Sequence, residues 1–411
     1  MTSVALLHRI TDFANRPDPY PLYAELRRTP VVRDEAGPYL VSTYWEIRSL
    51  LHDPRISSDA RNLTAEAARA TGQDQDPDLP PNFLRLDPPE HDRLRRLAMA
   101  PFGPPDTPRR VYDMHGELTD VVAGLIDGCR GKEQIDLVDD ISYPFPVTVI
   151  CRLLGVPRED EKLFHEWADT IAAGPDPVVT DEEREAKLDS VRRARRELAG
   201  YLAGLIEERR RSPRDDMLSA MAAGHGADGR MSPVEAVTTS ALLLVAGHET
   251  TVNLITNGML TLLRNPDVLQ RLRAEPDLAA PLVEELLRFE PPVQMLPQRT
   301  TLADIDIAGT IIPKGASVYL MLASGSRDPQ RFTDADRFIP DRADNQHLGF
   351  GHGLHACFGA PLARLEAQLA LTALVRRLDA PRLVEDPPPY RPNAVLRGPR
   401  HLPIAIGGIK G

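Results

Sequence analysis

Apolar residues recur at helical spacing in the middle of the chain. Between residues 181 and 211 they repeat near a 3.6-residue period, at Leu188, Val191, Leu198, Leu202 and Ile206. Acidic residues open this stretch and three arginines close it, so the charges oppose the helix macrodipole at both ends. The pattern predicts one long helix over 181–211.

The clearest helix start in the chain is Ser232-Pro233-Val234-Glu235. Ser232 can cap the helix, Pro233 suits the first helical position, and Glu235 completes a capping box. Asn265-Pro266 ends the pattern, which predicts a helix to Leu263, about 45 Å long. Apolar residues cover most of its faces, so we expect it to cross the core.

Shorter patterns predict strands near both ends of the chain. Residues 31–33 and 39–42 flank Gly37-Pro38 as in a hairpin, and 305–309, 317–321 and 402–406 also have strand character. The fold class is therefore mainly α with a small β region (α+β), with one small sheet assembled from both ends. We find no long linker, which predicts a single domain over 1–411. Its β-rich part would comprise about 30–43, 295–323 and 383–406.

Composition and charge exclude several classes of protein. The 411 residues are 42% hydrophobic and 27% charged, as in an ordinary globular protein. The formal net charge of -11 predicts no binding to nucleic acid or to a membrane surface. Three scattered cysteines argue against a disulfide framework. No apolar run is long enough for a membrane span or a secretory signal, so we expect a cytoplasmic protein.

The segment with the most chemical character is rich in glycine and contains Cys357. It reads Phe350-Gly351-His352-Gly353-Leu354-His355-Ala356-Cys357-Phe358-Gly359, and the next residues predict a helix. Glycines let the backbone approach a flat ligand closely. A cysteine near a helix N-terminus is stabilised as thiolate, and a thiolate is a good ligand for haem iron. An isolated buried cysteine, however, is usually structural.

This segment fits the pattern F-G-x-G-x-H-x-C-x-G at every fixed position and resembles the haem-binding loop of the cytochrome P450 family. Further motifs in the family's order extend the resemblance to bacterial soluble members over nearly the whole chain. The resemblance implies the cytochrome P450 fold, with the long central helix over haem b. It also implies that Cys357 is the axial iron ligand. The other loop residues that it assigns to cofactor binding are Phe350, Gly351, His355 and Gly359.

A second motif, Ala246-Gly247-His248-Glu249-Thr250-Thr251, lies within the predicted central helix. An acid–alcohol pair is unusual in an apolar helix, and Gly247 costs about 1 kcal/mol there relative to Ala. Such costs are expected at functional sites, although a polar turn or a helix kink is the plain alternative. The resemblance implies that Glu249 relays protons, that Thr250 bonds the dioxygen, and that Ala246 and Gly247 face the cofactor.

Two further sets of residues receive roles from the resemblance. In Glu285-Leu286-Leu287-Arg288, the Glu and Arg share a helix face, and in the family they pair with a second Arg that Arg337 resembles. Buried haem carboxylates need cationic or hydrogen-bonding partners. The residues that the resemblance assigns to them are His91, Arg95, Arg299 and His355. A solvated helix face is the alternative for His91 and Arg95.

The substrate pocket is inferred from position relative to these motifs. Its candidate residues are Leu242, Val245, Ala246, Val293, Gln294, Met295, Leu296 and Leu396, and core packing is their alternative. The loop 57–81 is expected to roof the pocket. The apolar lining favours a medium-sized hydrophobic substrate such as a polyketide or macrolide, a terpenoid or a steroid.

The resemblance implies a haem-thiolate monooxygenase that inserts one oxygen atom of dioxygen into a C–H bond, by hydroxylation or epoxidation. Because the chain has no flavin or iron–sulfur motif, we expect electrons from ferredoxin and ferredoxin reductase, with NAD(P)H as ultimate donor. Candidates for a basic docking patch on this expected monomer are Arg96, Arg109, Arg110 and Arg364, with scattered solvated arginines as the alternative. A haem-binding sensor, a peroxide-driven peroxygenase and a thiol hydrolase remain as other functions.

Overall fold

The structure is a computed structural model that describes residues 4–34, 37–64, 81–100, 109–172, 181–223 and 229–411. The chain falls into two compact units, each built from stretches that are separated in the sequence. The first unit comprises 1–73, 119–142 and 250–411, and the second comprises 74–118 and 143–249. The single domain over 1–411 therefore stays a prediction.

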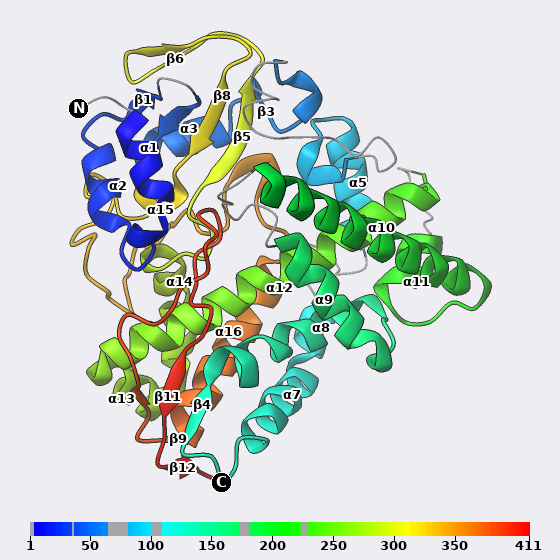
Figure 1. Ribbon diagram of the computed structural model, residues 1–411, viewed down its shortest axis with the longest axis vertical. Helices are drawn as coiled ribbons and strands as arrows, with labels where there is room; N and C mark the ends of the chain where they lie inside the picture. Colours follow the sequence, from blue (N-terminus) through cyan, green and yellow to red (C-terminus); the bar gives the residue numbers. More distant parts are fainter. Residues whose placement is uncertain (1–3, 35–36, 65–80, 101–108, 173–180, 224–228) are drawn as a thin grey trace. The chain divides into compact units, whose positions relative to one another are not determined.

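The first unit contains a five-stranded sheet in the order β1-β2-β8-β5-β3 (Figure 1). The predicted hairpin is present as β1 (Val31–Arg33) and β2 (Tyr39–Val41), and β2 runs parallel to β8 (Ser317–Leu320). β5 (Leu296–Thr301) joins β8 to β3 (Ile56–Ser57). Aliphatic residues of β2 and β8 pack on α3 (Tyr44–Leu51) in one buried cluster.

Three smaller sheets correct the prediction of one sheet assembled from both chain ends. The C-terminal strand β11 (Pro403–Ala405) pairs with β10 (Arg382–Leu383) and with β4 (Gln134–Asp136), not with the N-terminal strands. The pattern missed β4 because its three residues contain a single apolar side chain, Ile135. The other two sheets are β6 (Ile305–Ile307) with β7 (Thr310–Ile312), and β9 (Leu378–Asp379) with β12 (Gly408–Ile409).

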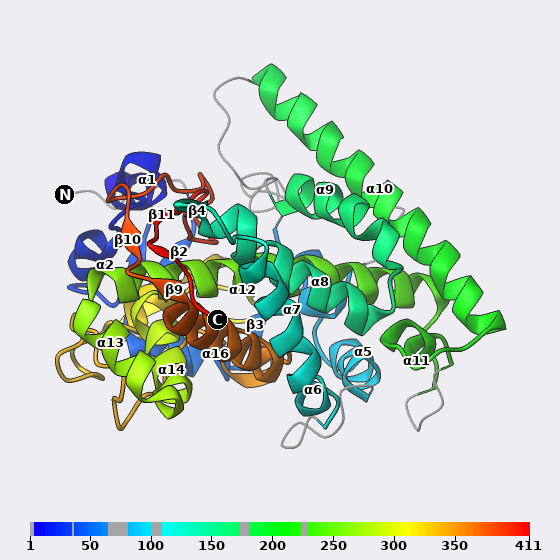
Figure 2. The same ribbon diagram turned by 90° about the horizontal axis from the view of Figure 1, so that it is seen from below.

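Helices of the first unit lie before and after Cys357 along the chain. Three of them lie side by side in Figure 2, namely α13 (Pro266–Ala274), α14 (Ala279–Phe289) and α16 (Ala360–Arg377). The predicted final helix is therefore confirmed and begins just after the cysteine segment. The remaining α-helices that lie wholly in this unit are α1 (Val4–Thr11), α2 (Tyr20–Leu26) and α15 (Leu322–Gly325).

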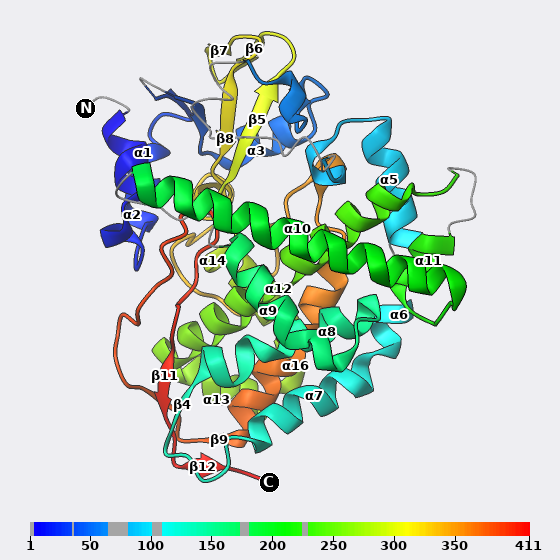
Figure 3. The ribbon, with the colours of Figure 1, turned by 45° about the vertical axis from the view of Figure 1, so that its right-hand side comes forward.

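The second unit is helical in its described residues. The predicted long helix is confirmed as α10 (Asp181–Arg211), and α9 (Glu161–Ala172) and α11 (Met217–Ala223) pack along it (Figure 3). The other α-helices that lie wholly in this unit are α5 (Glu90–Met99), α6 (Arg109–Asp113) and α8 (Pro144–Leu154).

Two helices run from one unit into the other: α7 (His115–Asp127) and α12 (Pro233–Arg264). The capping box that predicted α12 is formed, since Glu235 N donates to Ser232 Oγ at 3.2 Å and Ser232 N to Glu235 Oε2 at 2.7 Å. Residues 251–262 are all buried, as expected for a helix that crosses a core. Among the helices that the structure describes, none is long and apolar enough to span a membrane.

Candidate functional site

The Cys357 segment folds as a tight loop immediately before α16. Cys357 N donates to the carbonyl oxygen of Phe350 at 2.9 Å, which closes the loop on itself. The helix begins three residues later, at Ala360, so the loop lies at the positive end of the helix dipole. Cys357 is exposed, whereas Cys129 and Cys151 are buried. Burial raises the pKa of the Cys151 thiol to about 12, which makes it unreactive.

Two loop glycines have backbone conformations that favour glycine. Gly351 has φ +65° and Gly353 has φ +68°. A Cβ on Gly353 would lie 2.2 Å from the carbonyl oxygen of Leu51, so a side chain there would displace the backbone. A Cβ on Gly359 would lie 3.9 Å from the Cys357 sulfur. Gly351 and Gly353 thus allow the loop to turn tightly, and Gly359 adds no side chain next to the sulfur.

Glu284 on α14 supports this loop through its carboxylate, a role that the sequence pattern did not suggest. Glu284 accepts two hydrogen bonds from Arg364, at 2.6 and 2.9 Å, and lies 3.1 Å from His347 Nε2. Arg364 in turn lies 4.7 Å from the centre of the Phe350 ring, and Gly349 N donates to His347 Nδ1. Burial opposes ionisation of Glu284, but the bonds from His347 and Arg364 lower its pKa to about 2.

The neighbouring residue Glu285 is the centre of a second network, in which Glu285 and Arg288 are both fully buried. Arg288 donates to its carboxylate twice, at 2.8 Å each, as the sequence predicts. The third member is Arg342, whose Nε lies 3.1 Å from Glu285 Oε2. The prediction of Arg337 is wrong for this role. Its side chain is 74% exposed and pairs with Asp334, and only its backbone carbonyl takes part by accepting from Arg288.

The predicted Glu249-Thr250 pair lies in the middle of α12, across the boundary between the two units. In the second unit, Glu249 is 3% exposed and the His248 ring packs edge-on against Tyr143 with centroids 4.6 Å apart. Ala246 is exposed, and Leu242 and Val245 are half-buried on the same helix. A partly accessible apolar stripe therefore leads to the acid–alcohol pair.

The predicted carboxylate partners occur in both units, and each is held separately. In the second unit, His91 on α5 is 1% exposed and its Nδ1 lies 2.7 Å from Asp92 Oδ1. Arg95, one turn further on, is half-buried. In the first unit, Arg299 on β5 and His355 in the cysteine loop are also half-buried. The solvated helix face that was the alternative for His91 is excluded by its burial.

The predicted pocket residues after Pro291-Pro292 differ in exposure, because some are half-buried and others are fully buried. Val293 and Leu396 form an isolated antiparallel bridge and are both half-buried, as is Leu296. Gln294 and Met295 are corrected, because they are 0% and 1% exposed and cannot line an accessible pocket. Gln294 accepts from Tyr23 Oη at 3.1 Å, and Met295 packs in the cluster around Tyr20 and Leu26.

Two predictions remain, the docking arginines and the loop 57–81. Some of these residues pair within the chain, and others lie outside the described residues. Arg110 donates to Asp215, and Arg364 belongs to the brace on Glu284, so both have partners within the chain. Arg96 is exposed, and nothing is described for the Arg109 side chain. In the predicted loop 57–81, Ser57 belongs to β3 and residues 65–80 lie outside the described residues.

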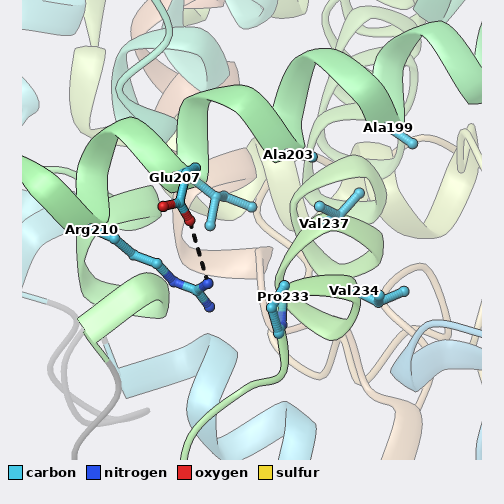
Figure 4. Close-up of a pocket in the computed structure, with 8 residues that line it drawn as sticks. Ala199, Ala203, Glu207, Arg210, Pro233, Val234 and Val237 are labelled. Carbon is cyan, nitrogen blue, oxygen red and sulfur yellow. Dashed lines mark ion pairs between the residues drawn. The ribbon is translucent and has the colours of Figure 1, made fainter.

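A groove of about 230 Å³ lies in the second unit, between α10 and the start of α12 (Figure 4). Its lining is mostly apolar, with Ala199 and Ala203 on one side and Val234 and Val237 on the other. Its charged residues, Glu207 and Arg210, pair with each other at 3.7 Å. The groove therefore contains no group placed for chemistry.

The residues of the cysteine loop fit a haem. The donor is an exposed thiol at the start of a helix, a position that favours the thiolate that haem iron binds. Gly359 places no side chain beside the sulfur, where a Cβ would lie 3.9 Å from it, and glycine backbone can approach a flat group closely. Both features belong to the first unit and do not depend on the second.

Comparison with known proteins agrees with this fit. Residues 62–404 match the family model described as cytochrome P450. The chain is 41% identical to the cytochrome P450 monooxygenase PikC of Streptomyces venezuelae, over 96% of this chain and 92% of PikC. It is 38% identical to vitamin D(3) 25-hydroxylase of Pseudonocardia autotrophica, over 95% and 94% of the two chains. The ligand-free crystal structure of CYP164A2 from Mycobacterium smegmatis superposes with a TM-score of 0.88 at 40% identity, covering 98% and 100% of the chains.

The chain therefore belongs to the cytochrome P450 family. It is an oxidoreductase of the monooxygenase class with the P450 fold, and the family implies a haem-iron cofactor, a substrate, dioxygen and redox partners. The predicted pairing of Glu285 with Arg288 is present, whereas the roles of Cys357, Glu249 and Thr250 stay predictions. Sequence reasoning missed Arg342, Glu284 and His347. Glu284 directly precedes the predicted Glu285, and this adjacency of two acids was the available signal.

Proposed function

We propose that this protein is a haem b monooxygenase that hydroxylates or epoxidises a medium-sized hydrophobic molecule. The observation that carries the proposal is Cys357: an exposed thiol, in a loop closed by its own backbone, directly before α16. The balanced reaction consumes the substrate C–H, dioxygen, two electrons and two protons, and yields the C–OH product and water. Haem supplies the binding and reductive activation of dioxygen when it is present.

Cys357 would hold the iron through its thiolate, with Phe350, Gly351 and Gly359 shaping the loop beneath the ring. Four basic residues would bind the haem carboxylates, namely His91, Arg95, Arg299 and His355. His91 would do so through Nε2, because Nδ1 is turned toward Asp92. Ala246 and Gly247 would present a small surface to the ring, since larger side chains at these positions would crowd it.

Glu249 and Thr250 would deliver the protons. The Glu249 carboxyl is buried and would carry a proton toward the reaction centre on an oxygen atom. The Thr250 hydroxyl would donate a hydrogen bond from Oγ1 and accept a proton in turn. A protein that only sensed haem ligands would not need this pair.

The substrate class follows from the apolar character of the pocket candidates that stay half-buried or exposed. These are Leu242, Val245, Ala246, Val293, Leu296 and Leu396. A relative named as a vitamin D(3) hydroxylase supports a medium-sized hydrophobic substrate, such as a polyketide or macrolide, a terpenoid or a steroid. Electrons would come from a ferredoxin and its NAD(P)H-dependent reductase.

The proposal is tested with purified protein, ferredoxin and reductase. Cys357→Ala should abolish the thiolate-type spectrum of the reduced carbon monoxide complex. Thr250→Ala should keep that spectrum but consume NADPH with little product, because proton delivery is lost. Thr256→Ala is the matched control, since Thr256 Oγ1 bonds within α12 to Val252 O at 2.8 Å.

Two results would overturn the proposal. If the Cys357→Ala protein kept the thiolate-type spectrum, Cys357 would not be the iron ligand. A haem-loaded wild type that forms no product with any hydrophobic compound in the presence of reductant would identify a sensor instead.

A further inference from the structure

Two wall segments of the proposed pocket are joined by a very short piece of sheet. Val293 and Leu396 form a single antiparallel bridge. On its two sides, Gln294 N donates to Val395 O and Arg397 N donates to Pro292 O, both at 2.8 Å. One bridged pair is too short to hold its own position. The place of Leu396 in the wall must therefore be fixed by neighbouring contacts.

Arg397, next to Leu396, makes most of these contacts. Its side chain is 1% exposed, and it donates from Nε to Arg16 O at 2.8 Å and from Nη2 to Pro17 O at 2.6 Å. Its Nη1 pairs with Glu290. The planar fork of Arg suits several acceptors at once, and a buried charge is tolerated only when it is paired and hydrogen-bonded.

Glu290 completes the anchor from the end of α14. Its carboxylate accepts from Tyr20 Oη at 3.2 Å and from Arg327 Nη2 at 3.1 Å, in addition to Arg397. Burial opposes its ionisation, but the positive charges of Arg397 and Arg327 lower its pKa. Glu290 therefore stays charged, and the anchor persists over the ordinary pH range.

Asn257 connects this anchor to the helix of the acid–alcohol pair. Its Nδ2 donates to Arg397 O at 3.0 Å and to Glu290 O at 3.4 Å, so one amide bonds to the backbone of both charged residues of the anchor. Asn257 lies seven residues after Thr250 on α12 and so on the same helix face. Within the described residues, its Oδ1 has no hydrogen-bond partner.

We propose that Arg397, Glu290 and Asn257 are positioning residues that fix the Val293–Leu396 wall relative to Thr250 and thereby select ligands by width. Arg397 and Asn257 are buried, so we infer that they act on a ligand through Leu396, the chain neighbour of Arg397. The inference rests on the proposed function. The ligands that it concerns are hydrophobic molecules wide enough to touch the wall.

The test compares a wide and a small iron-binding azole on the haem-loaded protein. Arg397→Lys keeps the charge but loses the fork, and Asn257→Leu keeps the branching at Cγ but loses the donor. Each variant should raise the Kd of econazole about fivefold, as expected for one lost hydrogen bond. Each should leave the Kd of imidazole within about twofold, because imidazole needs only the iron. Asn257→Leu should fold, since it also removes an acceptor without a partner.

Thr261→Val is the control, because Thr261 Oγ1 bonds only within the helix, to Asn257 O at 2.7 Å. It should change neither Kd. Equal weakening of both azoles, or no change in either, would overturn the positioning role. A wild type without a haem spectrum or an imidazole shift would overturn the proposed function itself, and the two failures are therefore distinguishable.

Discussion

At the scale of single residues, Glu285 shows why a buried carboxylate needs several donors. It is 0% exposed and receives hydrogen bonds from Arg288, Arg342, Asn345 and the backbone N of Ile339. Removing one partner of such a group leaves a charge buried without compensation. The segment that leads to the cysteine loop is thereby tied to α14.

The corrected third member of this network gives a direct test. Arg342→Ala should lower the free energy of unfolding by about 3 kcal/mol and reduce haem content, because it removes a positive charge and the shared Nε donor from buried Glu285. Arg337→Ala should change it by less than about 0.5 kcal/mol, since that side chain is exposed. Urea unfolding followed by circular dichroism measures both. Equal effects of the two substitutions would contradict the assignment of Arg342.

Glu284 predicts a pH dependence. Its pKa of about 2 lies below the ordinary value of 4.5, so its stabilising contribution is present above pH 4.5 and is lost as pH falls toward 2. Glu284→Gln should therefore cost about 2 kcal/mol at pH 7 and much less near pH 2. Unfolding curves of wild type and variant at several pH values measure this difference. A gap that stays constant to pH 2 would rule out an ionised Glu284 as the brace.

At the scale of elements, the cysteine loop and α16 act as one unit. The loop turns through two glycines and ends where the helix begins, so the sulfur is held by backbone geometry more than by side chains. The brace through Glu284, Arg364 and Phe350 supports it from α14 and α16.

The two loop glycines should respond differently to substitution. Gly353→Ala adds a Cβ 2.2 Å from Leu51 O, whereas the nearest atom to a Cβ on Gly351 is 4.0 Å away. Gly351→Ala should cost about 1 kcal/mol for its backbone conformation. Gly353→Ala must also displace the loop and should lose most of the thiolate-type carbon monoxide spectrum. That spectrum, measured per haem, compares the two. A Gly353→Ala protein that matches Gly351→Ala would show that the Leu51 contact does not matter.

At the scale of the whole molecule, net charge and local charge oppose each other. The chain carries -11 overall, which repels an acidic electron donor at long range. Two of the proposed docking arginines, Arg110 and Arg364, already have carboxylate partners within the chain. Arg96 on α5 is exposed, so its side chain is accessible for contact with a donor.

The salt dependence of reduction separates these effects. If an acidic ferredoxin docks on local arginines, its second-order reduction rate should fall several-fold between about 50 and about 300 mM salt. Arg96→Gln should lower the rate at low salt, and Arg376→Gln, at the C-terminal end of α16, should not. Stopped-flow reduction under carbon monoxide measures both. A rate that rises with salt would mean that the net charge dominates and that no basic docking patch exists.

The sequence by itself determined the features that adjacent residues create together. The capping box at Ser232, the helix over 181–211 and the turn around Cys357 each depend on residues within a few positions of one another, so their pattern is visible in one dimension. The tertiary structure decided which distant groups meet. Arg342 binds Glu285 in place of Arg337, and Gln294 turns inward to Tyr23. Such choices depend on which side chain reaches a buried acceptor after the chain has folded, and spacing along the sequence does not encode that reach.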